Sequence, residues 1–143
     1  MPPLQIAIDT NVVVSALHSR LGASFLLLSL VGRSLLFETN LSVPLVLEYE
    51  DVAKRPGLVP ALSEQEIDDV LDYLCFAAHR HAISFLWRPF LKDPKDDMVL
   101  ELAVQAGCDY IVTFNQKDFA GSDQFGVGVL TPREFLQKIG LVA

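Results

Sequence analysis

The sequence of 143 residues holds four acidic positions that surface charge alone does not explain. One ends the first strand, one interrupts an apolar helix, one begins the helix before the fourth strand, and one follows that strand. These positions are Asp9, Glu48, Asp96 or Asp97, and Asp118 with the nearby Asn115. In parallel sheets that are covered by helices, functional groups gather at the carboxyl ends of the strands. We therefore hypothesise, from topology, that these side chains meet in one site.

A cluster of four carboxylates would be electrostatically unstable on its own. Two unit charges ~4 Å apart repel by about 4 kcal/mol at an effective dielectric constant of 20, and four acids form several such pairs. A divalent cation would remove this conflict, and a ligand set made only of oxygen favours Mg²⁺ or Mn²⁺ over zinc. Such ions activate water and stabilise the charge that builds on a phosphoryl group. The cluster therefore predicts phosphodiester hydrolysis, and the sequence offers no nucleophilic serine or cysteine with a histidine partner.

The elements that must position these acids alternate between strands and helices. The short apolar run 4–8, which ends at Asp9, is typical of a strand buried on both faces. Further strands are expected at 34–38, 82–86, 109–113 and 127–130. Helices are expected at 11–17, 23–31, from 40 or 42 to 54, at 64–78, at 94–106 and after 131. This alternation predicts an α/β protein, a three-layer α/β/α sandwich with a central, mainly parallel sheet, in a single domain over residues 1–143.

Three helix starts carry recognisable capping residues. Ser63 with Glu66 forms a capping box, and the segment Thr131-Pro132-Arg133-Glu134 forms a second one. Asp93 can cap a helix whose first turn contains Pro94, where a missing N–H costs little.

Composition limits the kind of protein further. Hydrophobic residues make up 51% of the chain, enough for a substantial core, and the net charge is -7 with a pI near 4.8. Such acidity argues against a binder of nucleic acid that relies on a basic patch alone, but not against an enzyme whose acidic site holds metal. Cys75 and Cys108 lie in apolar surroundings and are expected to be reduced residues of a cytoplasmic protein. No signal peptide or membrane helix is expected, since the apolar stretch 25–31 is far shorter than the ~20 residues that a span needs.

Five pieces of the sequence, which together span nearly the whole chain, occur in an order that is similar to a known family. They are Ile8-Asp9-Thr10-Asn11-Val12, Ser42 with Glu48 and Arg55-Pro56, Asp93-Pro94-Lys95-Asp96, residues 110–119, and residues 130–136. In this order they resemble the PIN domain family, and within it the VapC-like toxins of bacterial and archaeal toxin–antitoxin pairs. The resemblance implies a Mg²⁺- or Mn²⁺-dependent ribonuclease that cleaves single-stranded RNA on an α/β/α fold.

The resemblance also implies which residues hold the metal. Asp9 matches the first metal-binding acid of the family and Glu48 the second. For the third we choose Asp96, because its offsets to the apolar stripe of its helix are those of the acid in the family motif. Asp97 is the alternative.

The fourth acidic position departs from the common family pattern. Many members have an aspartate after the threonine of this motif, where this chain has Asn115, and Asp118 follows three residues later. The amide oxygen of asparagine can bind a metal, but it carries no negative charge. Asn11 and Thr113 match polar positions that we expect to orient acids or water. The expected catalytic acids are thus Asp9, Glu48, Asp96 and Asp118, and the expected metal ligands are these four and Asn115.

Partners follow from the same resemblance. It implies an antitoxin that covers an apolar groove, and often a homodimer, and the apolar Phe25 and Leu28 could serve either contact. Basic residues near the proposed site could contact the phosphates of RNA, which position a strand without reading its sequence. They are Lys54, Arg55, Arg88, Lys92, Lys95 and Lys117.

Three other interpretations compete with this one. A phosphotransferase that forms an aspartyl phosphate also begins with a strand ending in Asp, but its general acid would fall on Asn11, which cannot donate a proton in that way. A dinucleotide-binding fold lacks its Gly-x-Gly-x-x-Gly motif after the first strand. The main competitor is a PIN-fold protein that only binds RNA or an antitoxin, having lost activity through Asn115.

Overall fold

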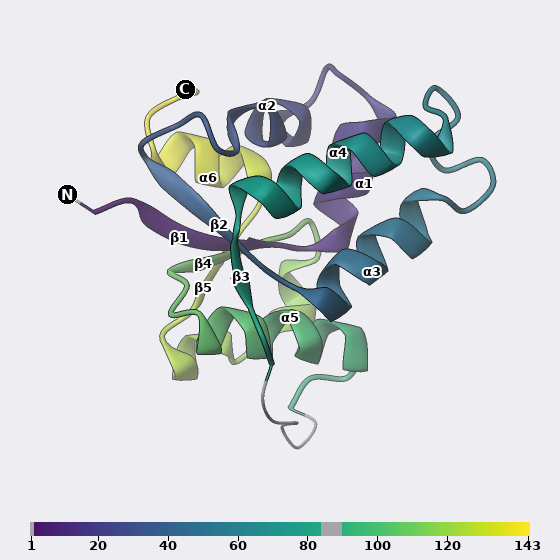
Figure 1. Ribbon diagram of the computed structural model, residues 1–143. Coiled ribbons are helices and arrows are strands. Elements are labelled where there is room, and N and C mark those ends of the chain that lie inside the picture. Colours follow the sequence, from purple (N-terminus) through teal and green to yellow (C-terminus); the bar gives the residue numbers. More distant parts are fainter. Residues whose placement is uncertain (1, 84–89) are drawn as a thin grey trace.

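A five-stranded sheet forms the centre of the protein in the computed structural model, which describes residues 2–83 and 90–143 (Figure 1). The strands are β1 (Leu4–Ile8), β2 (Phe37–Ser42), β3 (His79–His81), β4 (Tyr110–Val112) and β5 (Gly128–Leu130). They lie in the order β3-β2-β1-β4-β5, and every neighbouring pair is parallel. The mainly parallel sheet that the sequence predicts is confirmed, and in the described residues it is parallel throughout.

Helices cover both faces of this sheet. They are α1 (Thr10–His18), α2 (Ala23–Leu30), α3 (Val43–Ala53), α4 (Glu64–Ala77), α5 (Pro94–Gln105) and α6 (Pro132–Lys138). Figure 1 shows α5 on one side of the sheet and α1, α2, α4 and α6 on the other, while α3 packs against α1 and α4. Two short 3₁₀ helices, η1 (Gln116–Phe119) and η2 (Ser122–Phe125), connect β4 to β5. The predicted three-layer α/β/α architecture is therefore present.

The strand order defines where a ligand site is expected. Strands β2 and β3 lie along one edge of β1, and strands β4 and β5 lie along its other edge. In such sheets, the crevice for ligands lies outside the carboxyl ends of the strands, at the point where the order reverses. Here that point lies between β1 and β4. Asp9 follows β1, its backbone N–H donates to Val112 O (2.9 Å), and Thr113 follows β4.

The predicted helix starts are confirmed. Both capping boxes are present at the starts of α4 and α6, and Asp93 caps α5 by accepting a hydrogen bond from Lys95 N (2.9 Å). The core between the sheet and the helices is largely aliphatic. It also contains an edge-to-face contact between Phe37 and Phe135, whose ring centroids lie 5.4 Å apart. Neither cysteine forms a disulfide.

The predicted position of the second strand was wrong. The apolar Leu35 and Leu36 favoured a strand at 34–38, but they are 92% and 46% exposed, and β2 runs from Phe37 to Ser42. This strand buries polar side chains instead. Asn40 Nδ2 donates to Gln5 Oε1 (3.0 Å) and to Ile6 O (3.2 Å), so its burial leaves no donor unsatisfied.

The third strand also differs from the prediction. It was expected at 82–86, of which 84–86 lie outside the described residues, while Ala82 and Ile83 are not in a strand. The observed β3 begins just after α4 and pairs with β2 through polar contacts: His79 Nε2 lies 2.9 Å from Glu38 Oε1, and His81 Nε2 lies 2.8 Å from Asn40 Oδ1. A pattern of apolar residues could not reveal an edge strand of this kind.

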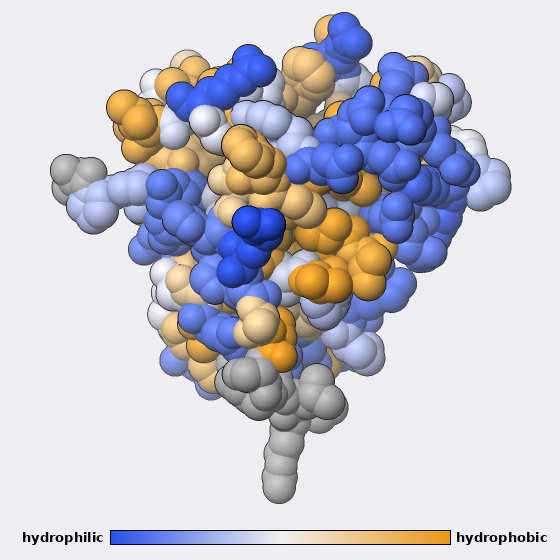
Figure 2. All heavy atoms as spheres, in the orientation of Figure 1, coloured by the Kyte–Doolittle hydropathy of each residue, from blue (hydrophilic) through white to orange (hydrophobic). Residues whose placement is uncertain are grey.

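Some apolar surface remains exposed. At the start of α3, Val43 and Leu47 are 71% and 57% exposed, and with Val46 they line a cavity of about 360 Å³ beside β3. Figure 2 shows apolar side chains gathered over this region. No single described helix is long and apolar enough to cross a membrane; α1 and α2 pass that test only as a pair, which is bent by 102°.

Candidate functional site

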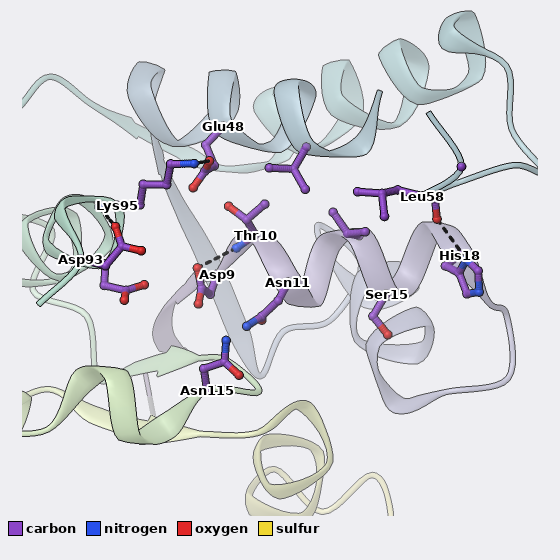
Figure 3. Close-up of a pocket in the computed structure, with 14 residues that line it drawn as sticks. Asp9, Thr10, Asn11, Ser15, His18, Glu48, Leu58, Asp93, Lys95 and Asn115 are labelled. Atoms are coloured by element: carbon purple, nitrogen blue, oxygen red, sulfur yellow. Dashed lines mark hydrogen bonds and ion pairs between the residues drawn. The ribbon is translucent and has the colours of Figure 1, made fainter. Parts of the chain in front are cut away.

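A cavity of about 580 Å³ opens at the carboxyl ends of β1 and β4, between α1, α3 and α5 (Figure 3). Four of the residues predicted to bind metal line this cavity, although they come from distant parts of the chain. They are Asp9, Glu48, Asp96 and Asn115. Asn11, predicted as a supporting polar residue, lines it too.

Asp9 is the most enclosed acid of the cavity, with 8% of its surface exposed. Its Oδ1 accepts a hydrogen bond from Thr10 N and its Oδ2 accepts one from Thr113 Oγ1, both at 2.8 Å. Burial raises the pKa of Asp9. The two hydrogen bonds oppose this effect, and the charges of Glu48 and Asp118 add to it. The folded protein therefore holds this carboxylate in a fixed orientation with its negative charge only partly compensated.

Thr113 connects Asp9 to the segment after β4. It is fully buried, and its Oγ1 accepts hydrogen bonds from Asn115 N (3.0 Å) and Asn11 Nδ2 (3.3 Å) while donating to Asp9. Asn11 Oδ1 in turn accepts from Phe114 N (3.3 Å). This network fixes the first turn of α1 against the end of β4, and so it holds Asp9 and Asn115 on the same side of the cavity.

Glu48 reaches the cavity from α3. The next residue, Tyr49, is fully buried and its hydroxyl donates a hydrogen bond to Ile8 O, which fastens α3 to the end of β1. Burial also raises the pKa of Tyr49 well above its usual value, so the hydroxyl keeps the proton that it donates. Glu48 itself is partly buried, and its Oε1 lies 3.4 Å from Lys95 Nζ. A lysine thus supplies the positive charge that faces this acid.

The two adjacent acids of α5 have different surroundings. Asp96 lines the cavity, and burial together with the charges of Asp9, Asp93 and Asp118 raises its pKa to about 7. Asp97 is buried elsewhere: its Oδ1 accepts hydrogen bonds from Phe90 N (3.2 Å) and Leu91 N (2.9 Å).

Asp118 lies at the edge of this arrangement. It belongs to η1, is exposed, and is not among the residues that line the cavity. Its charge nevertheless raises the pKa values of Asp9 and Asp96, so it contributes to the negative potential of the site.

Comparison with protein families finds one match. The PIN domain family matches residues 5–117, a stretch that begins in β1 and ends in η1. The chain belongs to the PIN domain family. A search of curated proteins found no match.

PIN domains are generally nucleases that use divalent metals. The matched stretch includes every predicted metal ligand except Asp118, which lies one residue beyond its end. This match identifies the PIN domain family but not the narrower VapC-like toxin group that the sequence resembles.

The donor atoms of this PIN domain suit a hard divalent cation. Asp9, Glu48, Asp96 and Asn115 each offer oxygen donors. Burial, and after it the neighbouring carboxylates, raise the pKa values of Asp9 and Asp96, and a bound cation would oppose both effects. In residues 2–83 and 90–143, however, no group of three or more His, Cys, Asp or Glu side chains is arranged so as to hold a metal ion. Binding would therefore require the side chains to draw together, and Lys95 would compete with the metal for Oε1 of Glu48.

Sequence reasoning missed part of the cavity wall in this PIN domain. Asp93 was expected only as a helix cap, but it also lines the cavity. The far end is formed by residues that had no assigned role: Val14, Ser15, His18, Val52, Gly57 and Leu58. For Ser15 and His18 the sequence does hold a signal. They follow Asn11 by four and seven residues, so they share its face of α1.

Proposed function

We propose that this PIN domain, a single domain over residues 1–143, is a Mg²⁺- or Mn²⁺-dependent endoribonuclease that hydrolyses single-stranded RNA. One observation carries the proposal. Asp9, Glu48, Asp96 and Asn115, which follow or belong to different elements, line one cavity at the point where the strand order reverses. These four residues would hold the metal, with Asp118 acting from the edge.

The protein's own groups prepare the site for this chemistry. A bound divalent cation would supply activation of water and stabilisation of phosphoryl charge. The hydroxyl of Thr113 and the amide of Thr10 fix both oxygens of Asp9 in orientation. Lys95 balances Glu48 and is close enough to the cavity to contact an RNA phosphate.

We further propose that the protein is a cytoplasmic toxin of a toxin–antitoxin pair. A groove of about 330 Å³ between α1, α2 and α4, lined in part by Phe25, Leu28 and Tyr73, would accept an apolar segment of the antitoxin. The exposed Val43 and Leu47 at the start of α3 offer a second apolar surface, which would suit a homodimer (Figure 2).

One alternative is supported by specific observations. A PIN-fold protein that only binds RNA or an antitoxin would be consistent with Asn115 in place of an acid. It would also be consistent with the absence, among the described residues, of a group of acids arranged to hold an ion. Such a protein would retain RNA but would not cleave it at any metal concentration.

Cleavage of a fluorescent single-stranded RNA tests these proposals. We expect cleavage with Mg²⁺ or Mn²⁺, none with excess EDTA, and none in the Asp9→Asn variant. Asp72→Asn is the matched control, because it makes the same chemical change on the exposed side of α4 and should leave cleavage unchanged. Robust cleavage in excess EDTA would contradict the mechanism, and RNA binding without cleavage would support the alternative.

A further inference from the structure

The cavity that holds the acids continues beyond them. Figure 3 shows Ser15, His18 and Leu58 at its far end, away from the acids. Val14, Val52 and Gly57, which also line the cavity, are within a few residues of these or one helical turn beyond Glu48. The whole cavity, at about 580 Å³, is within the range of pockets that bind small organic ligands, about 300–1,000 Å³. It is therefore larger than a metal ion and one phosphate require.

Helical periodicity explains why one cavity has two chemically different ends. On α1, Ser15 and His18 follow Asn11 by four and seven residues, and on α3, Val52 follows Glu48 by four. Residues at these spacings share one face of a helix. Near the sheet the two helices thus present Asn11 and Glu48 to the cavity, whereas one or two turns later α1 presents Ser15 and His18 and α3 presents Val52.

A hydrogen bond closes the far end. His18 Nδ1 lies 3.0 Å from Leu58 O, and because a carbonyl oxygen only accepts, Nδ1 must carry the proton. The same nitrogen donates in the neutral and in the protonated ring. This bond ties the end of α1 to the segment after α3, where Gly57 adopts a positive φ of 81°. The wall formed by Leu58 is therefore held in place.

The chemistry of this far end favours one kind of occupant. Val14, Val52 and Leu58 offer apolar surface, which would contact the flat faces of an aromatic ring. The hydroxyl of Ser15 has no hydrogen-bond partner within residues 2–83 and 90–143, so it is free to pair with a polar ring edge. Lys95 belongs to the acidic end, which leaves His18 as the one basic side chain lining the far end in the described chain.

We propose that the far end of the cavity is a nucleobase subsite, which binds the base of a nucleotide next to the phosphodiester that is cleaved. The inference rests on the proposed ribonuclease function and adds to it a site that selects bases. Single-stranded RNA is suited to this because its unstacked bases can be splayed out and read on their edges. Continuity of the cavity places such a base beside the acids that would act on its phosphate.

Filling the subsite tests the proposal. Val52→Phe adds a ring to the wall of the far end, and Val104→Phe makes the same change on α5, outside this cavity. We expect Val52→Phe to raise the KM for single-stranded RNA by about tenfold or more with a smaller effect on kcat, and Val104→Phe to leave both unchanged. Unaltered KM and kcat in a folded Val52→Phe protein would overturn the subsite.

Ser15→Ala provides a second test that places little demand on folding. Cleavage of RNAs that differ in one base shows the preference of the wild-type protein, and loss of the Ser15 hydroxyl should change that preference at least threefold for one base. An identical preference in both proteins would argue against base recognition by Ser15 and hence against the subsite as proposed.

A binding measurement separates this inference from the proposed function. Nucleoside monophosphates are titrated into metal-free protein while the methyl signals of Val14 and Val52 are followed by NMR. Shifts of both sets of methyls in the wild type, together with loss of the Val14 shift in Val52→Phe, would support the subsite even if no RNA is cleaved. No shift with any of the four nucleotides would overturn it, whatever the ribonuclease assay shows.

Discussion

Replacing Asp96 with asparagine is expected to stabilise the metal-free protein at pH 8, even though it removes a proposed metal ligand. Burial and the neighbouring carboxylates raise the pKa of Asp96 to about 7, whereas an aspartate in an unfolded chain has a pKa of about 3.9. Between these values the folded state binds a proton that the unfolded state does not. The free energy of unfolding therefore falls as the pH rises through this window, and the loss is complete above pH 7.

The expected size of the effect is modest. A shift of three pKa units would correspond to about 4 kcal/mol for an enclosed group, but Asp96 is only partly buried, and solvent and salt reduce this to roughly 1–2 kcal/mol. Asparagine also loses the favourable interaction of a carboxylate with the start of α5, about 0.3–1 kcal/mol. A net gain of about 1 kcal/mol remains, which corresponds to a rise in Tm of about 3–5 °C for a chain of this size.

Thermal unfolding in EDTA, followed by circular dichroism, measures this gain. Asp96→Asn should unfold at a higher temperature than the wild type at pH 8, and the difference should shrink toward zero near pH 4. Asp72→Asn controls for the general effect of removing one negative charge from an acidic protein. An equal Tm for Asp96→Asn and the wild type at pH 8 would refute the reasoning, as would the same gain in Asp72→Asn. With Mn²⁺ added, the wild type should gain more stability than Asp96→Asn.

Three further changes probe the same cavity. Lys95→Met removes the cation that faces Glu48, so the affinity for Mn²⁺ measured by calorimetry should rise. The same change should weaken RNA binding measured by fluorescence anisotropy. Unchanged Mn²⁺ affinity would contradict competition between the lysine and the metal. Asn115→Asp adds a charged oxygen to the cavity and should tighten Mn²⁺ binding, whereas weaker binding would place Asn115 outside the metal site. Thr113→Val leaves a buried oxygen of Asp9 without its donor and should cost about 1–3 kcal/mol in urea unfolding; a loss near zero would show that the hydroxyl does not support Asp9.

The parts of the fold that the sequence predicts well are those set by local chemistry. The capping boxes that begin α4 and α6 are satisfied within four residues of chain, so their detection needs no knowledge of the tertiary structure. The strands β2 and β3 are different. Asn40 is buried because Gln5 and Ile6 on another strand accept its hydrogen bonds, and the sequence does not reveal that these strands are neighbours.

The same distinction applies to the site. The sequence shows that acids stand next to several predicted strands and helices. Their convergence, however, depends on β4 lying directly beside β1. The hydrogen bond from Thr113 to Asp9 joins residues 104 positions apart and exists only because of that pairing. The ion pair of Lys95 with Glu48 and the extension of the cavity toward His18 likewise require α3 and α5 to be placed around α1.

Asp96 and Asp97 show how two identical side chains at one helix start acquire different roles. Successive residues on a helix point about 100° apart, so only one of them can face the cavity. Asp97 accepts hydrogen bonds from the backbone of Phe90 and Leu91, whereas Asp96 lines the cavity among other acids. The carboxylate of Asp97 is therefore stabilised by fixed N–H donors, while that of Asp96 has a raised pKa. Asp97 fixes the start of α5 to the preceding segment, so the position of Asp96 in the cavity depends on it. A substitution at Asp97 should therefore impair metal binding, measured by calorimetry, although it removes none of the four proposed ligands that line the cavity.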